Sequence, residues 1–107
     1  MKPAPFQYVR PTTLAEACRL LAQDEDARVI AGGQTLIPLL AMRLARPTML
    51  VDVARLPELG GMTREDDCIV VGAATRQADA EHAALIALAV PLLARALPWV
   101  GHPATRN

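Results

Sequence analysis

The sequence has no excess of charge of either sign. Eleven Lys and Arg residues are balanced by eleven Asp and Glu residues, so the formal net charge at pH 7 is zero. A protein that binds nucleic acid or an anionic membrane through its overall field needs a surplus of positive charge. We therefore expect no nucleic-acid partner, and any anion-binding site must be built locally from a few donors.

Long apolar runs are also missing, although 52% of the residues are hydrophobic. The longest run, 83–94, is interrupted by Pro91 and is shorter than the roughly 20 residues that a membrane-spanning helix requires. The first residues, MKPAPFQYVR, contain no apolar core of a secretory signal. The sequence thus predicts no transmembrane segment and a cytoplasmic location.

Cysteine is scarce. Only Cys18 and Cys68 occur, and neither has a second Cys or a His beside it at metal-ligand spacing. Helical spacing places Cys18 with Leu14 and Leu21 on an apolar helix face. We expect both thiols to be buried and reduced, because free Cys usually acts as a small core residue.

The first half of the sequence alternates short β-branched segments with helical ones. Strands are predicted near residues 6–10, 27–31 and 48–53, and helices at 14–23 and 36–45. This alternation is typical of a small parallel sheet. Thr13 and Glu16 have capping-box spacing at the start of the first helix. The strand at 27–31 is expected to be covered on both faces.

The pattern changes after residue 60. Two extended runs flank Glu65, Asp66 and Asp67, which predicts an antiparallel hairpin. Helices are predicted at about 76–88 and 90–97, and Pro91 suits the first turn of the second one. In the last ten residues, PWVGHPATRN, we expect neither a capped helix nor a closing strand. Two strands are too few to form a stable sheet alone.

The stretch VIAGGQTLIP is the strongest local signal for a binding site. It places Gly32 and Gly33 where a strand passes into a helix. Glycines there allow positive φ and let an anion approach the backbone amides, and a helix amino end adds partial positive charge. Gln34 and Thr35 add side-chain donors. The local features also suit a plain tight turn with Thr35 as the helix N-cap, which is a common arrangement.

A dinucleotide site of the Rossmann type is a further alternative. Asp52 ends a strand about 20 residues after the glycines, where that fold places an acidic residue on the ribose. The fingerprint requires three glycines at fixed offsets. With Gly33 as the second glycine, Ala31 and Leu36 occupy the other two positions. We therefore interpret Asp52 as a turn or cap residue.

Other polar and aromatic residues give weaker signals. Arg43 and Arg46 suit the solvated carboxyl end of the second helix. His82 and His102 lack the neighbours of a nucleophilic or metal site, so we expect them on the surface or in local structure. Trp99, the only Trp, is expected to be packed in the core rather than stacked on a ligand ring.

Several segments together resemble a known family. The segments YVRPTTLAEACRLLA, ARVIAGGQTLIPLLAMRLARPTMLVDVARLPEL, IVVGAATR and VGHPATRN occur in this order. The same order is found in the FAD-binding subunit of molybdenum hydroxylases, such as the medium subunits of bacterial carbon monoxide dehydrogenase and xanthine dehydrogenase-type enzymes. The resemblance covers essentially the whole chain, and AGGQTLIP followed by Arg43, Pro47 and LVD is its most specific part. It favours the phosphate cradle over the plain turn.

The resemblance implies an α+β fold of the vanillyl-alcohol-oxidase type. In this fold a small parallel α/β subdomain, here residues 1–56, precedes an antiparallel α+β subdomain, of which residues 57–107 would be the start. FAD lies between the two subdomains in this family. A second glycine motif, Arg-Gly-Thr-Ile-Gly-Gly, follows the segment that VGHPATRN resembles. The resemblance therefore implies an amino-terminal fragment.

The resemblance also implies a cofactor site and partners. By position, the FAD diphosphate residues of the family correspond to Ala31, Gly32, Gly33, Gln34, Thr35 and Leu36. The family often has His or Gln before Ser where this chain has Gln34 and Thr35, so polar donors are kept. In such enzymes electrons pass from a molybdopterin large subunit through 2Fe–2S clusters of a small subunit to FAD, and then to an acceptor.

We therefore expect an FAD-binding electron-transfer subunit that has no catalytic side chain and no metal ligands of its own. The alternative is a truncated, non-catalytic α/β module that binds no cofactor.

Overall fold

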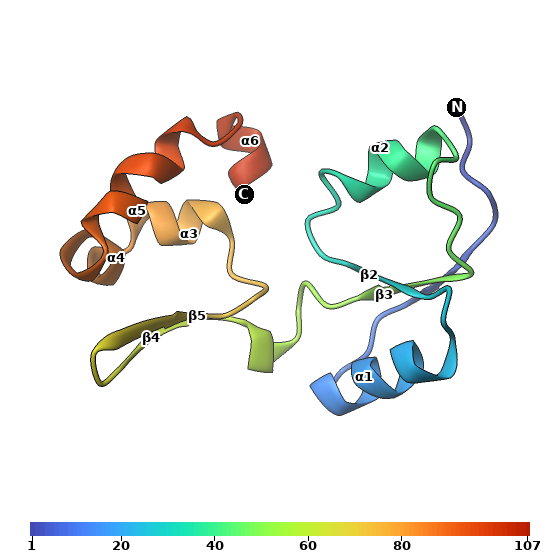
Figure 1. Ribbon diagram of the computed structural model, residues 1–107, viewed down its shortest axis with the longest axis horizontal. Coiled ribbons are helices and arrows are strands. Elements are labelled where there is room, and N and C mark those ends of the chain that lie inside the picture. Colours follow the sequence, from blue (N-terminus) through green and yellow to red (C-terminus); the bar gives the residue numbers. More distant parts are fainter. The chain divides into compact units, whose positions relative to one another are not determined.

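The computed structural model describes all residues, Met1–Asn107, and divides into two compact units. The units are Met1–Leu59 and Gly60–Asn107, so the division follows Leu59, close to the boundary after residue 56 that we expected. Each unit has its own sheet and its own apolar core (Figure 1). That these units are the two FAD-binding subdomains stays a prediction.

The first unit is built on a three-stranded parallel sheet. Its strands are β1 (Gln7–Val9), β2 (Arg28–Ile30) and β3 (Met49–Asp52), in the order β1-β3-β2. The parallel sheet predicted from the sequence is confirmed.

The strand that is covered on both faces is β3, not β2 as we expected. Leu50 and Val51 of β3 are fully buried, whereas Val29 of β2 is 47% exposed. The reason is topological, because β3 inserts between β1 and β2 and leaves β2 at the edge of the sheet.

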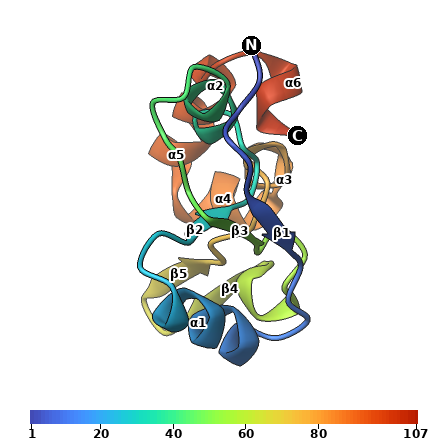
Figure 2. The same ribbon diagram turned by 90° about the vertical axis from the view of Figure 1, so that its right-hand side faces the viewer.

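Two helices cover opposite faces of this sheet. Figures 1 and 2 show α1 (Leu14–Gln23) on one side and α2 (Leu36–Ala41) on the other. Successive residues of a strand point to opposite faces, so Leu50 and Val51 contribute to different layers. Val51 packs with Ala17 of α1 in a core that also contains Val53 and Leu56. The 3₁₀ helix η1 (Pro57–Leu59) closes this unit.

The predicted cap of α1 is confirmed. The Glu16 amide donates to Thr13 Oγ1 at 3.1 Å, as in a capping box. The Glu16 carboxylate accepts from the Thr12 amide at 3.0 Å, one residue earlier than the usual partner. The Leu14 amide donates to the Glu58 carboxylate at 3.1 Å. Three amides at the start of α1 are therefore paired with side chains.

Helix α2 is shorter than predicted. We expected it to reach about residue 45, but it ends at Ala41 because Arg43 adopts a left-handed conformation, with φ of 57°. The Leu44 amide then donates to Leu39 O at 2.9 Å and the Arg43 amide to Leu40 O at 3.0 Å. These two bonds form a Schellman motif, which terminates a helix. The spacing of the leucines could not show this left-handed residue.

The second unit begins with the predicted antiparallel hairpin. Strands β4 (Met62–Glu65) and β5 (Cys68–Val71) pair with Glu65 opposite Cys68. The two-residue turn between them places Asp66 at a φ of 52°, a conformation that Asp tolerates better than most residues.

The helices of the second unit differ from the prediction in one place. The expected helix at 76–88 is two helices, α3 (Gln77–His82) and α4 (Ala84–Ala89), because Ala83 is extended. In one straight helix Ala80 and Ile86 would point in directions about 120° apart. The break lets both join Leu97 in a single apolar core. Tertiary packing therefore overrides the local helical tendency.

The remaining helices are α5 (Pro91–Ala96), the 3₁₀ helix η2 (Leu97–Trp99) and α6 (Pro103–Arg106). Pro91 opens α5 as predicted. Helix α6 lies in the last residues, where we expected neither a capped helix nor a closing strand, and no side chain caps its amino end. None of the helices is long and apolar enough to cross a membrane.

We predict that Thr13→Ala lowers the free energy of unfolding by about 1 kcal/mol, because the Glu16 amide loses its acceptor. Thr13→Ser keeps the hydroxyl and should stay close to the unsubstituted chain. Urea denaturation followed by circular dichroism measures both. Equal losses in the two variants would show that the Thr13 methyl group, not the cap, matters.

Candidate functional site

The six predicted site residues lie together in one continuous segment between β2 and α2. Strand β2 ends at Ile30, Ala31–Thr35 form the connecting loop, and Leu36 is the first residue of α2. The loop residues are exposed except for Gly33, which is half-buried. We refer to residues 31–36 as the glycine loop.

The glycine loop contains a run of free backbone donors. The amides of residues 32–36 donate to no acceptor in the chain. The loop carbonyls are used instead, since Gly33 O accepts from the Ile37 amide at 2.9 Å and Thr35 O from the Leu39 amide at 3.4 Å. Successive free amides in a turn form a concave site for anions. The loop can therefore bind anionic oxygens without a Lys or Arg.

The side chains of the loop are also free to bind a ligand. Thr35 occupies the N-cap position of α2, but its hydroxyl makes no capping hydrogen bond. The plain-turn interpretation required that hydroxyl as the cap, so the structure does not favour it. Gln34 is exposed and its side chain has no partner within the chain. Both side chains could donate to an anion held by the amides.

The two glycines have different roles. Gly33 has a φ of 72°, and a Cβ there would lie 2.9 Å from Ile37 Cγ1. Both the turn and its close contact with α2 therefore require glycine at this position. Gly32 is not in the left-handed region, and a Cβ there would meet nothing within 4 Å. The open space over Gly32 is where a ligand can approach the backbone.

The helix dipole contributes less than the sequence suggested. Helix α2 has only six residues, from Leu36 to Ala41. A short helix has few aligned peptides, so the partial charge at its amino end is smaller than that of a long helix. The free amides of the loop are therefore the main source of positive potential.

The Rossmann alternative is excluded by topology and by the environment of Asp52. In a Rossmann fold the first two strands are neighbours, whereas β3 separates β1 and β2 here. Asp52 accepts hydrogen bonds from the Tyr8 hydroxyl and, at 2.9 Å, from the Ala54 amide. Arg10 Nε lies 3.8 Å from its carboxylate. The interpretation of Asp52 as a turn residue is confirmed.

The contact between Tyr8 and Asp52 changes the pKa of both groups. Burial raises the pKa of Asp52, but the hydrogen bonds from Tyr8 and Ala54, with the charges of Arg10 and Arg55, outweigh it and lower that pKa below its ordinary value. The hydrogen bond to Asp52 raises the pKa of Tyr8. Sequence reasoning missed this pair because it depends on β1 lying beside β3, which strand patterns do not reveal.

Three expectations about single residues are wrong. Cys18 and Cys68 are free but exposed, since Ala17 rather than Cys18 faces the core. Trp99 is 88% exposed and does not fill the core.

The two histidines and the two arginines have local structural roles. His82 is exposed, with Nδ1 2.8 Å from Ala78 O, and His102 O accepts from the Thr105 amide and hydroxyl. Arg43 donates to Lys2 O at 3.0 Å and Arg46 to Arg43 O at 3.2 Å. No group of three or more metal-ligating side chains is present.

Comparison with known proteins identifies the domain type. Residues 4–107 match the family model described as the FAD binding domain in molybdopterin dehydrogenase. The chain is 44% identical to subunit alpha of the 6-hydroxypseudooxynicotine dehydrogenase complex of Paenarthrobacter nicotinovorans, over all of this chain and 36% of that protein. It is 38% identical to the carbon monoxide dehydrogenase medium chain of Hydrogenophaga pseudoflava, over all of this chain and 38% of that protein.

Solved structures agree with the sequence matches. A carbon monoxide dehydrogenase from Hydrogenophaga pseudoflava matches with a TM-score of 0.96 at 38% identity. Quinoline 2-oxidoreductase from Pseudomonas putida 86 matches with a TM-score of 0.96 at 41% identity. Each match covers all of this chain and 38% of the solved chain. The chain thus spans little more than a third of the proteins that it matches.

We predict that Tyr8→Phe lowers the free energy of unfolding at neutral pH and that this difference shrinks as the pH falls below about 4. The lowered pKa of Asp52 means that its stabilisation is present above the unfolded-state pKa and is lost on protonation. Denaturation curves between neutral and acidic pH measure the difference. An offset that stays constant with pH would contradict the role of Asp52.

Proposed function

Because this chain belongs to the family of FAD binding domains of molybdopterin dehydrogenases, we propose that its glycine loop binds the diphosphate of FAD. The amides of residues 32–36 would donate to the phosphate oxygens, and Gln34 and Thr35 would add side-chain donors. The observation that carries the proposal is the run of free amides beside the open face of Gly32. It fits a doubly charged anion better than a metal ion, because amides are donors only.

The residues of the loop suit this cofactor in shape as well as in charge. The space over Gly32 is open, since a Cβ at that position would meet no protein atom within 4 Å, so a phosphate could lie against the backbone. Ala31 and Leu36 are the apolar residues at the two ends of the loop. Ala31 has the smallest apolar side chain, and Leu36 is half-buried. Neither adds a charge that would repel the diphosphate.

We further propose that the chain is part of an electron-transfer subunit. Bound FAD supplies the redox chemistry, while the protein supplies binding and position. The matching proteins are named as medium chains or subunits of dehydrogenases, which supports a multisubunit oxidoreductase. The partners would be an iron–sulfur small subunit and a molybdopterin large subunit, which deliver electrons to FAD.

The length of the relatives bears on the rest of the cofactor site. Since the chain spans little more than a third of them, we propose that the remaining contacts to FAD lie outside these 107 residues.

We also propose a cytoplasmic location, where exposed thiols such as Cys18 and Cys68 stay reduced. The alternative of a non-catalytic module that binds no cofactor is not favoured by the comparisons.

The first test separates the roles of the two glycines in the full natural chain that contains these residues. Gly33→Ala should lower the free energy of unfolding by about 1–2 kcal/mol, because Ala is strained at positive φ. Gly32→Ala should leave stability unchanged but weaken FAD binding, because its Cβ enters the space for the phosphate. Thermal unfolding and the bound-flavin spectrum measure the two effects. A Gly32→Ala variant with full FAD affinity would contradict the proposed approach of the diphosphate.

The second test removes one donor. Thr35→Val keeps the side-chain shape but deletes the free hydroxyl, so FAD affinity should fall about tenfold, the loss typical of one hydrogen bond to a charged group. Thr63→Val on the exposed face of β4 is the matched control and should not change FAD affinity. Calorimetric titration with FAD measures both variants. The titrations use the full natural chain that contains these residues, and absence of FAD binding by that unsubstituted chain would favour the non-catalytic alternative.

A further inference from the structure

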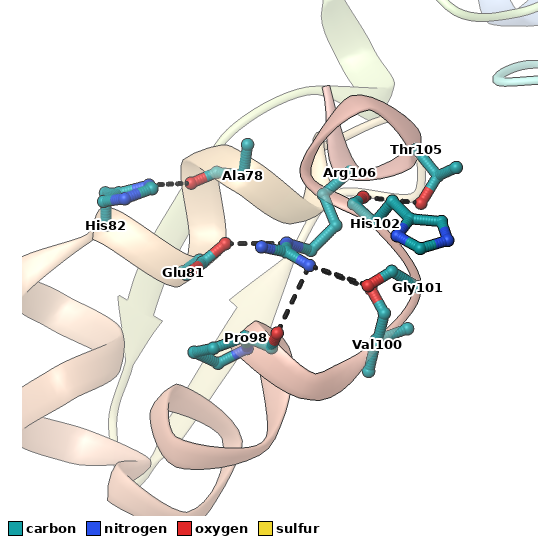
Figure 3. Close-up of polar contacts among 9 residues, drawn as sticks. All are labelled: Ala78, Glu81, His82, Pro98, Val100, Gly101, His102, Thr105 and Arg106. Carbon is teal, nitrogen blue, oxygen red and sulfur yellow. Dashed lines mark hydrogen bonds and ion pairs between the residues drawn. The ribbon is translucent and has the colours of Figure 1, made fainter.

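Arg106 is the one charged residue that is buried in this chain, with 8% of its surface exposed. Its Nε donates to Glu81 Oε2 at 2.9 Å, so the two side chains form an ion pair between α6 and α3. Figure 3 shows the guanidinium between Glu81 and the turn that follows η2. Both ends of the ion pair are shielded, since the Glu81 side chain is only 15% exposed.

The same guanidinium donates hydrogen bonds to three backbone carbonyl oxygens. Arg106 Nη1 donates to Pro98 O at 3.3 Å, to Val100 O at 3.2 Å and to Gly101 O at 3.2 Å. These carbonyls belong to the end of η2 and the residues that follow it, which we call the 98–101 turn. One side chain thus connects three parts of the second unit: α3, the 98–101 turn and α6.

Helix α6 has no other buried anchor. It has four residues, Pro103–Arg106, and Arg106 is the only one that is buried. The apolar core of the second unit is formed by Ala80, Ile86 and Leu97, none of which belongs to α6. Helix α6 is therefore held on α3 by polar contacts of Arg106 rather than by apolar packing.

The 98–101 turn is tightly shaped around this contact. Gly101 has a φ of 63°, and a Cβ at that position would lie 2.6 Å from Thr105 Oγ1. The Thr105 hydroxyl donates to His102 O at 2.7 Å. A side chain at position 101 would be strained at this φ and would crowd the Thr105 hydroxyl, so the turn favours glycine there.

The cost of this arrangement argues for a specific role. Burying an ion pair costs desolvation energy, and an apolar residue can often provide equal stability. A planar guanidinium offers a rigid fork of donors that a flexible Lys does not. Arg106 contributes an orientation that an apolar residue could not. Its hydrogen bonds to one carboxylate and three carbonyls fix the orientation of α6 as well as its position.

We propose that Arg106 is a positioning residue for cofactor binding. By fixing the 98–101 turn and α6 on α3, it sets the direction in which the chain continues from α6 into the part of the subunit that the relatives possess beyond this match. This inference rests on the proposed function as an FAD-binding subunit. Arg106 would not contact FAD itself, and its effect would act through the orientation of the backbone.

The experiment uses the full natural chain that contains these residues. Arg106→Gln removes the charge and most of the fork. If the orientation of α6 is then populated about a tenth of the time, FAD affinity should fall about tenfold, because apparent affinity scales with the binding-competent fraction. Amide hydrogen exchange should rise in residues 98–106 but not in β4 and β5. Arg106→Lys should restore only part of the affinity, because Lys can pair with Glu81 but cannot also reach three carbonyls.

Two comparisons make the result decisive. Arg95→Gln, which removes a charge from α5 that has no ion-pair partner in the chain, should change neither affinity nor exchange. If Arg106→Gln does not fold, Arg106→Lys and Glu81→Gln are measured in its place. Faster exchange at 98–106 with unchanged FAD affinity would overturn the positioning role alone. Absence of FAD binding by the unsubstituted chain would overturn the proposed function and this inference with it.

Discussion

The insertion of β3 between β1 and β2 is the constraint on which the first unit depends. It gives β3 two neighbours and two covered faces, so Leu50 and Val51 are fully buried. Because all three strands are parallel, their carboxyl ends meet at one edge of the sheet. The connection after β1 leads to α1 and the connection after β2 leads to α2, on opposite faces (Figure 1). Ligands of open α/β sheets bind outside the carboxyl ends of the strands, and the glycine loop begins at that edge, directly after β2.

Packing at this edge explains why the loop has its particular shape. The chain must turn sharply between β2 and α2, and Gly33 makes the turn by adopting positive φ at a place where a Cβ would crowd Ile37. The same turn removes the following amides from any backbone partner. The free donors are thus a consequence of the fold. A side-chain cap by Thr35 would accept from the second or third residue of α2, but Ile37 donates to Gly33 O and Pro38 has no amide hydrogen, so the Thr35 hydroxyl is left free as well.

Sequence patterns predicted the features that depend on residues close in sequence and missed those that depend on residues brought close only by the fold. The bounds of α1, the cap at Thr13 and the start of α5 at Pro91 follow from short-range chemistry, and the structure confirms them. The end of α2 at Ala41, the break at Ala83 and the pairing of Tyr8 with Asp52 were missed. The break at Ala83 depends on the burial of distant residues and the Tyr8–Asp52 pair on strand order, while the end of α2 depends on the left-handed Arg43, which residue spacing does not reveal. The exposure of Trp99 belongs to the same class, because residue type indicates burial only on average.

The sequence pattern located the glycine loop because two adjacent glycines are a local signal. The pattern could not predict which amides and carbonyls of the loop form hydrogen bonds. Two adjacent glycines between a strand and a helix are compatible with a closed turn or with an open cradle. The structure adds that the amides of residues 32–36 are unpaired. Around Arg106 the backbone polar groups are paired instead of free. One buried guanidinium donates hydrogen bonds to three carbonyl oxygens that could have faced solvent. Exposed donors left unpaired remain available to a ligand, whereas acceptors paired with a buried charge stabilise one backbone path. The two units therefore use backbone polar groups differently: the first leaves amide donors of the glycine loop unpaired, and the second pairs carbonyls with a buried charge.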